Sequence, residues 1–276
     1  MPDTVSPSLR PPPRTEAAPR VPLPILVLAG IGAAFFVLPL AGLALRAPWA
    51  QALTELGRPE TLDALRLSLI CSLSATLISL LLGVPLAFVQ ARLEFRGRSL
   101  LRALTTLPMV LPPVVGGVAL LLAFGRRGLL GQYLFDGFGV RLPFSTAGVV
   151  LAETFVSMPF LVITVEAGLR SMNRRLEDAA RTLGASPGRV FTRVTVPMIA
   201  PSVFAGALLC WSRALGEFGA TITFAGNLPG QTQTTPLAVY LLLETRPEAA
   251  IILSLVLVAV SLAVLVALRD RYLRVG

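Results

Sequence analysis

The segment EDAARTLGASPGRVFTRVTVP, Glu177–Pro197, is polar and contains three arginines, yet it lies between two long apolar segments. It is too long for a tight turn and too short for a folded domain. To interpret this segment, the kind of protein that contains it has to be established first.

The composition of the chain is that of an integral membrane protein. Of its 276 residues 54% are hydrophobic and 14% are charged, and the mean hydropathy is +0.76. Soluble domains carry about 25% charged residues. The charges are also clustered, which leaves several segments of eighteen or more mostly apolar residues, long enough to cross a bilayer as helices.

The residue types that are missing exclude several functions. The chain has no histidine and no lysine, so all 24 basic residues are arginine. Without lysine there is no P-loop, and without histidine there is no imidazole base or ligand. Cys71 and Cys210 lie in apolar segments, where a thiol acts as a small hydrophobic side chain. We therefore predict no catalytic residue and no metal site.

Six apolar segments are predicted to span the membrane. They are Leu23–Leu45, Leu65–Val89, Leu100–Phe124, Ala147–Leu169, Met198–Phe224 and Ala249–Leu268. Residues 1–20, rich in proline and arginine, are predicted to be a disordered tail, and residues 21–276 the transmembrane domain, with a polar loop at about 170–197. Leu237–Glu244 is predicted to be a short helix, interfacial or re-entrant, and Thr245 and Glu248 form a capping-box pattern before the last span.

The arginines predict the orientation. If the N-terminus is cytoplasmic, sixteen of the 24 arginines fall in the cytoplasmic segments. This excess follows the positive-inside rule, so both termini and the opening segment are predicted to be cytoplasmic. The same placement beside the spans argues against nucleic acid as the partner of this basic chain, despite a pI of about 11.2.

The opening segment itself predicts a helix, a turn and a second helix. Glu177–Thr182 favours helix, Gly184 permits a left-handed turn, and Ser186-Pro187 is typical of a helix start. Pro197 is expected at the entry to the fifth span. The segment is also rich in small residues: Ala179, Ala180, Gly184 and Ala185. Local chemistry leaves two interpretations open, an interfacial helix on anionic lipid or a docking site for a cytoplasmic protein.

A longer pattern connects this segment with a known family. Asp178-Ala179-Ala180, three residues, Gly184, nine residues and Val194-x-Val196-Pro197 resemble the EAA loop of ABC-importer permeases, EAA-x3-G-x9-I-x-L-P. Aspartate replaces glutamate, and valine replaces isoleucine and leucine. Four other stretches are similar to the molybdate/sulfate/thiosulfate branch and most like its molybdate permeases: LPMVLPPVVGG (107–117), FGRRGLLG (124–131), RALGEFGATITFAGN (213–227) and LPGQTQTTPLAVY (228–240).

The resemblance implies an all-α protein with the six-helix fold of type I ABC-importer permeases, in the cell membrane of a prokaryote. It implies that the polar loop couples the chain to a cytoplasmic ABC ATPase dimer, which binds the ATP and magnesium, so that this chain binds no cofactor itself. The residues it assigns to coupling are Glu177, Asp178, Ala179, Ala180, Gly184, Ala185, Ser186, Pro187 and Pro197. A second copy of the chain, an extracytoplasmic oxyanion-binding protein and membrane lipids are the other implied partners.

The implied substrate is a tetrahedral oxyanion, with molybdate favoured. Tungstate has the same charge and shape, so the sequence does not separate the two. A sulfate or thiosulfate permease is the first alternative, and an ion-coupled secondary transporter is a remote one, since the two halves of the chain show no related interrupted helices.

Polar and helix-breaking residues inside the spans are candidates for the transport pathway. Arg213 and Glu217 are costly in a membrane, and their spacing of four predicts an ion pair on one helix face. The pair either borders the pathway or only fixes helix packing. The full set of candidates is Pro112, Pro113, Gly116, Ser157, Arg213, Glu217 and Thr221. Prolines and glycines in one span equally allow a simple packing kink, and serine and threonine often bond to their own helix.

Overall fold

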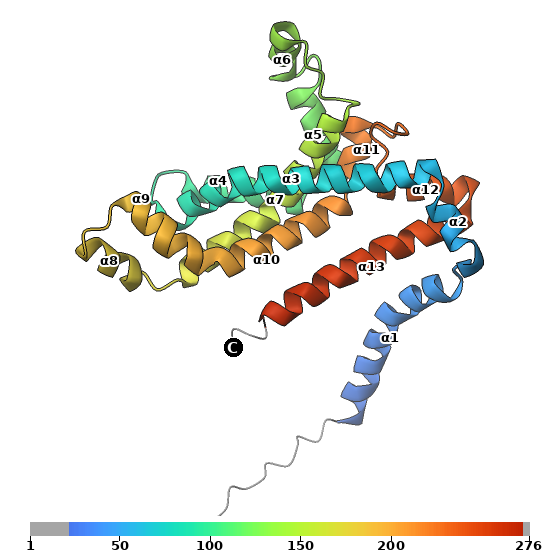
Figure 1. Ribbon diagram of the computed structural model, residues 1–276, viewed down its shortest axis with the longest axis horizontal. Helices are drawn as coiled ribbons and strands as arrows, with labels where there is room; N and C mark the ends of the chain where they lie inside the picture. Colours follow the sequence, from blue (N-terminus) through green and yellow to red (C-terminus); the bar gives the residue numbers. More distant parts are fainter. Residues whose placement is uncertain (1–21, 273–276) are drawn as a thin grey trace, which may run out of the picture. The chain divides into compact units, whose positions relative to one another are not determined.

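The computed structural model describes residues 22–272, and within them every regular element is a helix (Figure 1). The helices are α1 Leu23–Leu45, α2 Ala52–Leu56, α3 Pro59–Arg92, α4 Arg98–Thr106, α5 Pro113–Phe124, α6 Gly131–Phe138, α7 Thr146–Ser171, α8 Arg175–Thr182, α9 Pro187–Val190, α10 Val196–Leu215, α11 Gly219–Ala225, α12 Thr235–Thr245 and α13 Pro247–Tyr272. Residues 107–109 form a 3₁₀ turn, and 191–195 a π-helical turn that joins α9 to α10. The tail predicted at 1–20 lies outside the described residues.

The chain divides into two units at Arg46. The first contains α1, an apolar helix with no buried residue in this single chain. An isolated helix that is apolar on all sides is typical of a membrane span. The second unit contains all the other helices and the core.

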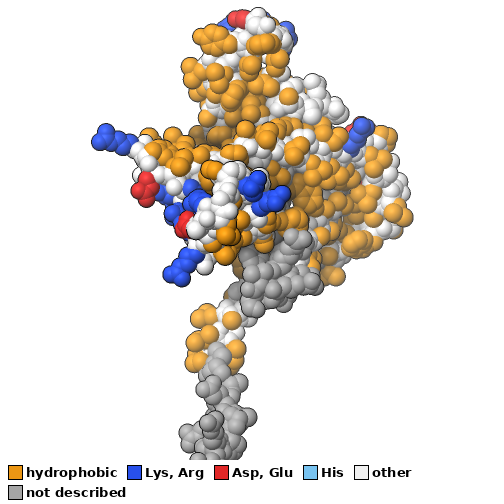
Figure 2. Space-filling model, turned by 60° about the vertical axis from the view of Figure 1, so that its left-hand side comes forward, with side chains coloured by type: hydrophobic (Ala, Val, Ile, Leu, Met, Phe, Trp, Pro, Cys, Tyr) orange, Lys and Arg blue, Asp and Glu red, His pale blue; other side chains and the backbone are white. Residues whose placement is uncertain are grey.

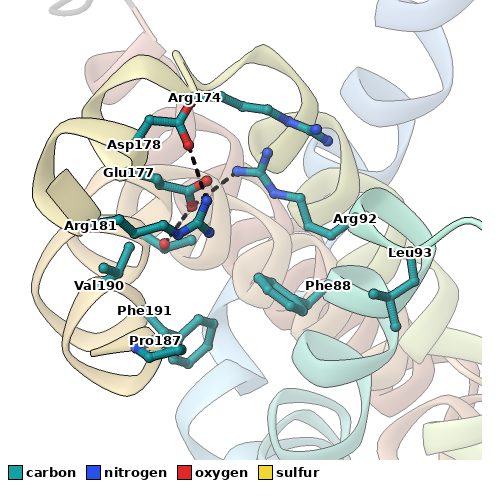
Figure 3. Close-up of a pocket in the computed structure, with 11 residues that line it drawn as sticks. Phe88, Arg92, Leu93, Arg174, Glu177, Asp178, Arg181, Pro187, Val190 and Phe191 are labelled. Carbon is teal, nitrogen blue, oxygen red and sulfur yellow. Dashed lines mark hydrogen bonds and ion pairs between the residues drawn. The ribbon is translucent and has the colours of Figure 1, made fainter. Parts of the chain in front are cut away.

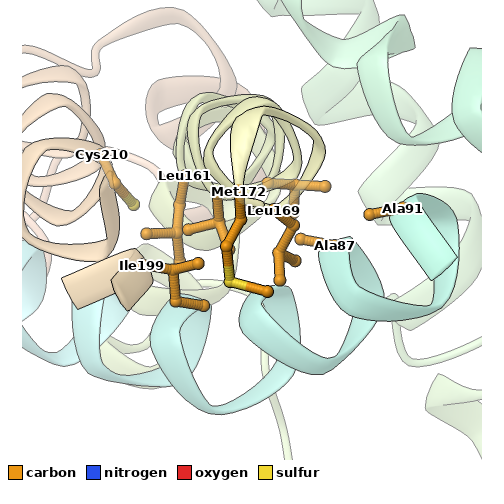
Figure 4. Packing of buried hydrophobic residues seen from close by; sticks show 9 residues of the cluster. Ala87, Ala91, Leu161, Leu169, Met172, Ile199 and Cys210 are labelled. Carbon is orange, nitrogen blue, oxygen red and sulfur yellow. The ribbon is translucent and has the colours of Figure 1, made fainter. Parts of the chain in front are cut away.

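The core of the second unit is built around α7, the most buried of its long helices. Leu161, Val165 and Leu169 of α7 are inaccessible to solvent and lie between Ala87 of α3 and Ile199 of α10 (Figure 4). A second cluster joins α7 to α5 and α11, and a third joins α3 to α12 and α13. Small residues on α3 let α7 approach closely, as in other membrane helix pairs.

The outside of the bundle is apolar. Large hydrophobic side chains four residues apart on α3, Leu69, Leu73, Leu77 and Leu81, are between 45% and 72% exposed. Figure 2 shows hydrophobic side chains over most of one face, with charged groups confined to a few places. Soluble monomers rarely expose apolar patches on this scale, so the surface is one that faces lipid or another membrane helix.

Within the described residues, five helices are long and apolar enough to cross a membrane, and a sixth span exists if one bent pair is counted. The predicted third span, Leu100–Phe124, was wrong as a single helix. It is a pair, Arg98–Met109 and Pro113–Phe124, bent by 118°. Pro112 and Pro113 break it, since Pro113 has no N–H to donate and starts α5 at its first position.

The predicted fifth span was also misplaced at both ends. The helix runs from Pro187 through the π-helical turn to Leu215, whereas the prediction placed it at Met198–Phe224. Gly216 ends it, and Gly219–Ala225 forms the separate helix α11. The capping box before the last span is absent too: the Thr245 hydroxyl donates to the Leu241 carbonyl, within α12.

Candidate functional site

The polar loop has the predicted helix–turn–helix form. Its first helix, α8, starts after Asn173, whose side-chain oxygen accepts a hydrogen bond from the Arg175 N–H. Gly184 ends it with a φ of +81°, a left-handed value that glycine adopts without strain. The second helix starts at Pro187 as predicted, although the Ser186 side chain makes no capping bond. We call residues 183–187, from the end of α8 to the first residue of α9, the elbow.

The outer face of the loop is exposed and carries little side-chain bulk. Asp178, Ala179 and Pro187 are exposed, and Ala180 and Ala185 are half-buried. At the elbow Leu183 is 89% exposed, an apolar side chain with nothing covering it in this chain. Asp178 pairs with Arg181 of its own helix at 3.0 Å. Such a surface suits close approach by another protein.

The inner face of the loop is held by Glu177, which is only 5% exposed (Figure 3). Its Oε1 accepts a hydrogen bond from Nη2 of Arg92 at 3.2 Å and another from the Thr195 hydroxyl at 2.6 Å. Arg92 is the last residue of α3, and Thr195 lies in the π-helical turn before α10. One carboxylate oxygen therefore connects three elements.

A cavity of about 420 Å³ lies beside these contacts. Its apolar wall includes Phe88 and Phe191, whose rings meet edge to face at 5.3 Å. Arg92, Arg174 and Arg181 contribute its basic groups. The cavity separates the loop from the end of α3, so Glu177 is where α8 makes contact across it.

The candidate pathway residues gather where two helices break. The start of α5 at Pro113 lies against the start of α11, because a Cβ placed on Gly219 would be 2.6 Å from the Pro113 Cβ. Arg213, in the last turn of α10, forms the predicted ion pair with Glu217. Glu217 lies beyond the end of that helix, so the expectation of one continuous helix face was wrong even though the pair forms.

The remaining candidates are buried around these breaks or within the core. Thr221 is fully buried on α11, and Gly116 is buried on α5 against Phe155. Ser157 is buried too, and it accepts a hydrogen bond from the Cys210 thiol at 3.3 Å. Ser157 therefore belongs to the packing between α7 and α10.

The sequence did not predict the contacts made by three residues, Arg92, Thr195 and Glu166. Arg92 and Thr195 are 85 and 18 residues from Glu177, and no local pattern links them. Glu166 binds Arg170, four residues further along α7, at 2.8 Å. That spacing on a helix was a signal that could have found it.

Comparison with known proteins identifies the family. Residues 79–275 match the family described as binding-protein-dependent transport system inner membrane component. The chain belongs to this family. The match covers α7, the polar loop and both helix breaks.

Several individual proteins have sequences similar to that of this chain along most of its length. Molybdenum transport system permease protein ModB of Mycobacterium tuberculosis is 48% identical over 240 residues, covering 87% of this chain and 90% of that protein. ModB of Escherichia coli K12 is 42% identical over 211 residues, covering 76% and 92%. Sulfate transport system permease protein CysT of Salmonella typhimurium is 35% identical over 213 residues, covering 76% of each.

A solved structure has the same fold. A chain of a bacterial ABC transporter that imports the acidic polysaccharide alginate superposes with a TM-score of 0.72 at 18% identity, covering 92% of this chain and 96% of that one. The fold predicted from sequence, that of an ABC-importer permease, is thereby confirmed.

Proposed function

We propose that this chain is the membrane-spanning permease subunit of an ATP-driven importer for a tetrahedral oxyanion, with molybdate as the substrate. The observation that carries the proposal is the similarity along most of the chain to molybdenum permeases, which exceeds the similarity to sulfate permeases. Tungstate, with the same shape and charge, is an expected second substrate.

The elbow is the proposed docking site for a separate ATPase dimer, which binds the ATP and magnesium. Its exposed Leu183 and small neighbours fit a cleft on a partner, and the chain has no lysine for a P-loop of its own. Because one chain offers one elbow and an ATPase dimer offers two sites, two copies of this chain are expected in the complex.

The loop is built to move the helix that follows it. Since α9 continues through the π-helical turn into α10, displacement of the elbow acts on α10 directly. The far end of α10 is the break at Gly216, next to the start of α5. ATP binding biases the two copies between inward- and outward-facing states only if the elbow binds the ATPase more strongly in one of them.

Selectivity is proposed to lie mainly on an extracytoplasmic binding protein. The buried polar groups near the helix breaks come from scattered positions on α7 and α11, and from Glu217 between α10 and α11. The pathway then needs only to admit an oxyanion that the binding protein delivers, and membrane lipids surround the pair of subunits.

Uptake by reconstituted vesicles tests this function. Vesicles containing this chain and its ATPase, supplied with the oxyanion-binding protein, should import molybdate only when ATP is present. Excess tungstate should compete and excess sulfate should not. Preferential sulfate import would assign the chain to the sulfate permeases, and uptake driven by an ion gradient without ATP would make it a secondary transporter.

A further inference from the structure

The attachment of α8 to the rest of the molecule depends on one side chain. In α8, all of which the structure describes, Glu177 is the only buried residue. Asp178 and Arg181 line the cavity as well, but their side chains are more than half exposed and pair with each other rather than with α3 or the π-helical turn (Figure 3). Anything that pushes on the outer face of α8 must therefore act on the bundle chiefly through Glu177 or through the covalent link at the elbow.

The contacts of Glu177 are suited to transmit such a push. The side chains of Glu177 and Arg92 are 7% and 9% exposed, and Thr195 is 1% exposed. A hydrogen bond to a charged acceptor in a poorly hydrated site is strong, and removing one partner leaves a buried charge uncompensated. The three groups should therefore remain together when the loop moves.

Glu177 joins α3 to the π-helical turn that leads into α10, and both α3 and α10 pack against α7 in the main core. Ala87 and Ala91 of α3 pack on one side of α7, and Ile199 of α10 packs in the same cluster (Figure 4). Phe88 and Phe191 provide a second contact between α3 and the π-helical turn. Loss of Glu177 would leave that aromatic contact in place, so it would free α8 without separating α3 from α10.

We propose that Glu177 is a positioning residue that carries the displacement of the polar loop into α3 and α10 together, without touching the ATPase. This inference rests on the proposed function, in which the loop receives that displacement. It gives Glu177 a role distinct from its neighbour Asp178, whose carboxylate is exposed and pairs with Arg181 of the same helix.

The test separates docking from transmission. Glu177→Ala should still co-purify with the ATPase and support ATP hydrolysis, while the ATP consumed per molybdate imported rises about tenfold, a usual size for coupling between sites. Glu177→Gln keeps an acceptor for Arg92 and Thr195 and should retain more coupling than Glu177→Ala. Glu94→Ala, which removes an exposed carboxylate near the end of α3, is the matched control and should behave as wild type.

A second variant covers the case in which Glu177→Ala does not fold. Thr195→Val is nearly isosteric and removes only the 2.6 Å hydrogen bond, so it should fold and lose coupling to a smaller extent. A normal ATP-to-molybdate ratio in both variants would overturn the proposal. Loss of ATPase co-purification in Glu177→Ala with a normal fold would overturn it too, in favour of direct docking.

Failure of the proposed function gives a different pattern. If the chain is no ATP-driven permease, the wild-type complex itself shows no ATP-dependent uptake. If the elbow is not the docking site, Leu183→Asp still co-purifies with the ATPase. Both of these results come from proteins that keep the Glu177 contacts. They can therefore be distinguished from a failure of the proposal about Glu177.

Discussion

Arg213, in the last turn of α10, forms an ion pair with Glu217, in the break between α10 and α11, with 2.5 Å between Nη2 and Oε2. The other carboxylate oxygen, Oε1, accepts a hydrogen bond from the Ala220 N–H at 2.8 Å, in the first turn of α11. Glu217 is 2% exposed. The pair thus holds the end of one helix to the start of the next, beside the break at Pro113.

Arg213→Gln should therefore destabilise the protein. It leaves Glu217 buried without a counter-charge, which costs about 3 kcal/mol in comparable buried pairs. The measurement is thermal unfolding of the purified chain in detergent. The double variant Arg213→Gln with Glu217→Gln should recover most of the loss, and Arg127→Gln, at an exposed arginine, should have little effect.

The same variants distinguish packing from a pathway role. If Arg213 draws the oxyanion inward, the double variant stays impaired in molybdate uptake although its stability is restored. Wild-type uptake by the double variant would limit Arg213 to packing.

Gly117 is predicted to be essential for the approach of α5 to α11. A Cβ placed there would lie 2.5 Å from the Thr223 Cβ and 3.0 Å from the Ala220 carbonyl oxygen. Gly117→Ala should force the two helices apart and cost about 1–3 kcal/mol, as overpacking does in other cores. Gly137→Ala, where a Cβ meets nothing within 4 Å, is the control. Equal melting temperatures for the two variants would contradict this packing.

The sequence predicted best what local residue chemistry decides. Gly184 and Ser186-Pro187 specified the turn and the start of α9, because backbone conformation at these positions depends mainly on the residues themselves. The ion pair of Arg213 with Glu217 was predicted because four residues remain within reach even though Gly216 ends the helix between them.

The sequence-based predictions failed where the chain changes direction and where contacts join residues far apart in the sequence. Hydropathy sums apolar residues whatever the direction of the chain, so Leu100–Phe124 was predicted to be one span, although Pro112 and Pro113 bend this segment by 118°. The contact between Glu177 and Arg92 joins positions 85 residues apart, and only the tertiary structure brings them together. The position of Pro197 was misjudged because the helix already begins at Pro187.

Glu166 is predicted to fix α4 to the bundle. Its Oε1 accepts a hydrogen bond from Arg102 of α4 at 2.5 Å and forms an ion pair with Arg170 of its own helix at 2.8 Å, and its side chain is 9% exposed. Glu166→Gln should lower stability by about 2 kcal/mol, the usual size for a hydrogen bond to a charged group, because Arg102 and Arg170 are 35% and 49% exposed and water still solvates them. Chemical or thermal unfolding of the purified chain would measure the change.

The exposed pair of Asp178 and Arg181 supplies the comparison for Glu166. Both side chains are more than half exposed, so Asp178→Asn should change stability by at most about 1 kcal/mol. A loss as large as that of Glu166→Gln would show that burial does not explain the difference between the two pairs.

Ser186→Cys tests on which side of the membrane the elbow lies. Ser186 is exposed, while the two natural cysteines, Cys71 and Cys210, are fully buried and should react slowly with a membrane-impermeant maleimide. In intact cells Ser186→Cys should stay unlabelled, and in inverted vesicles it should label rapidly. Gly137→Cys, in the connection after the third predicted span, should show the opposite pattern.

Adding the ATPase to the inverted vesicles should protect Ser186→Cys if the elbow is the docking site, because the partner then covers it. Labelling of Ser186→Cys from outside intact cells would place the loop beyond the reach of any cytoplasmic ATPase.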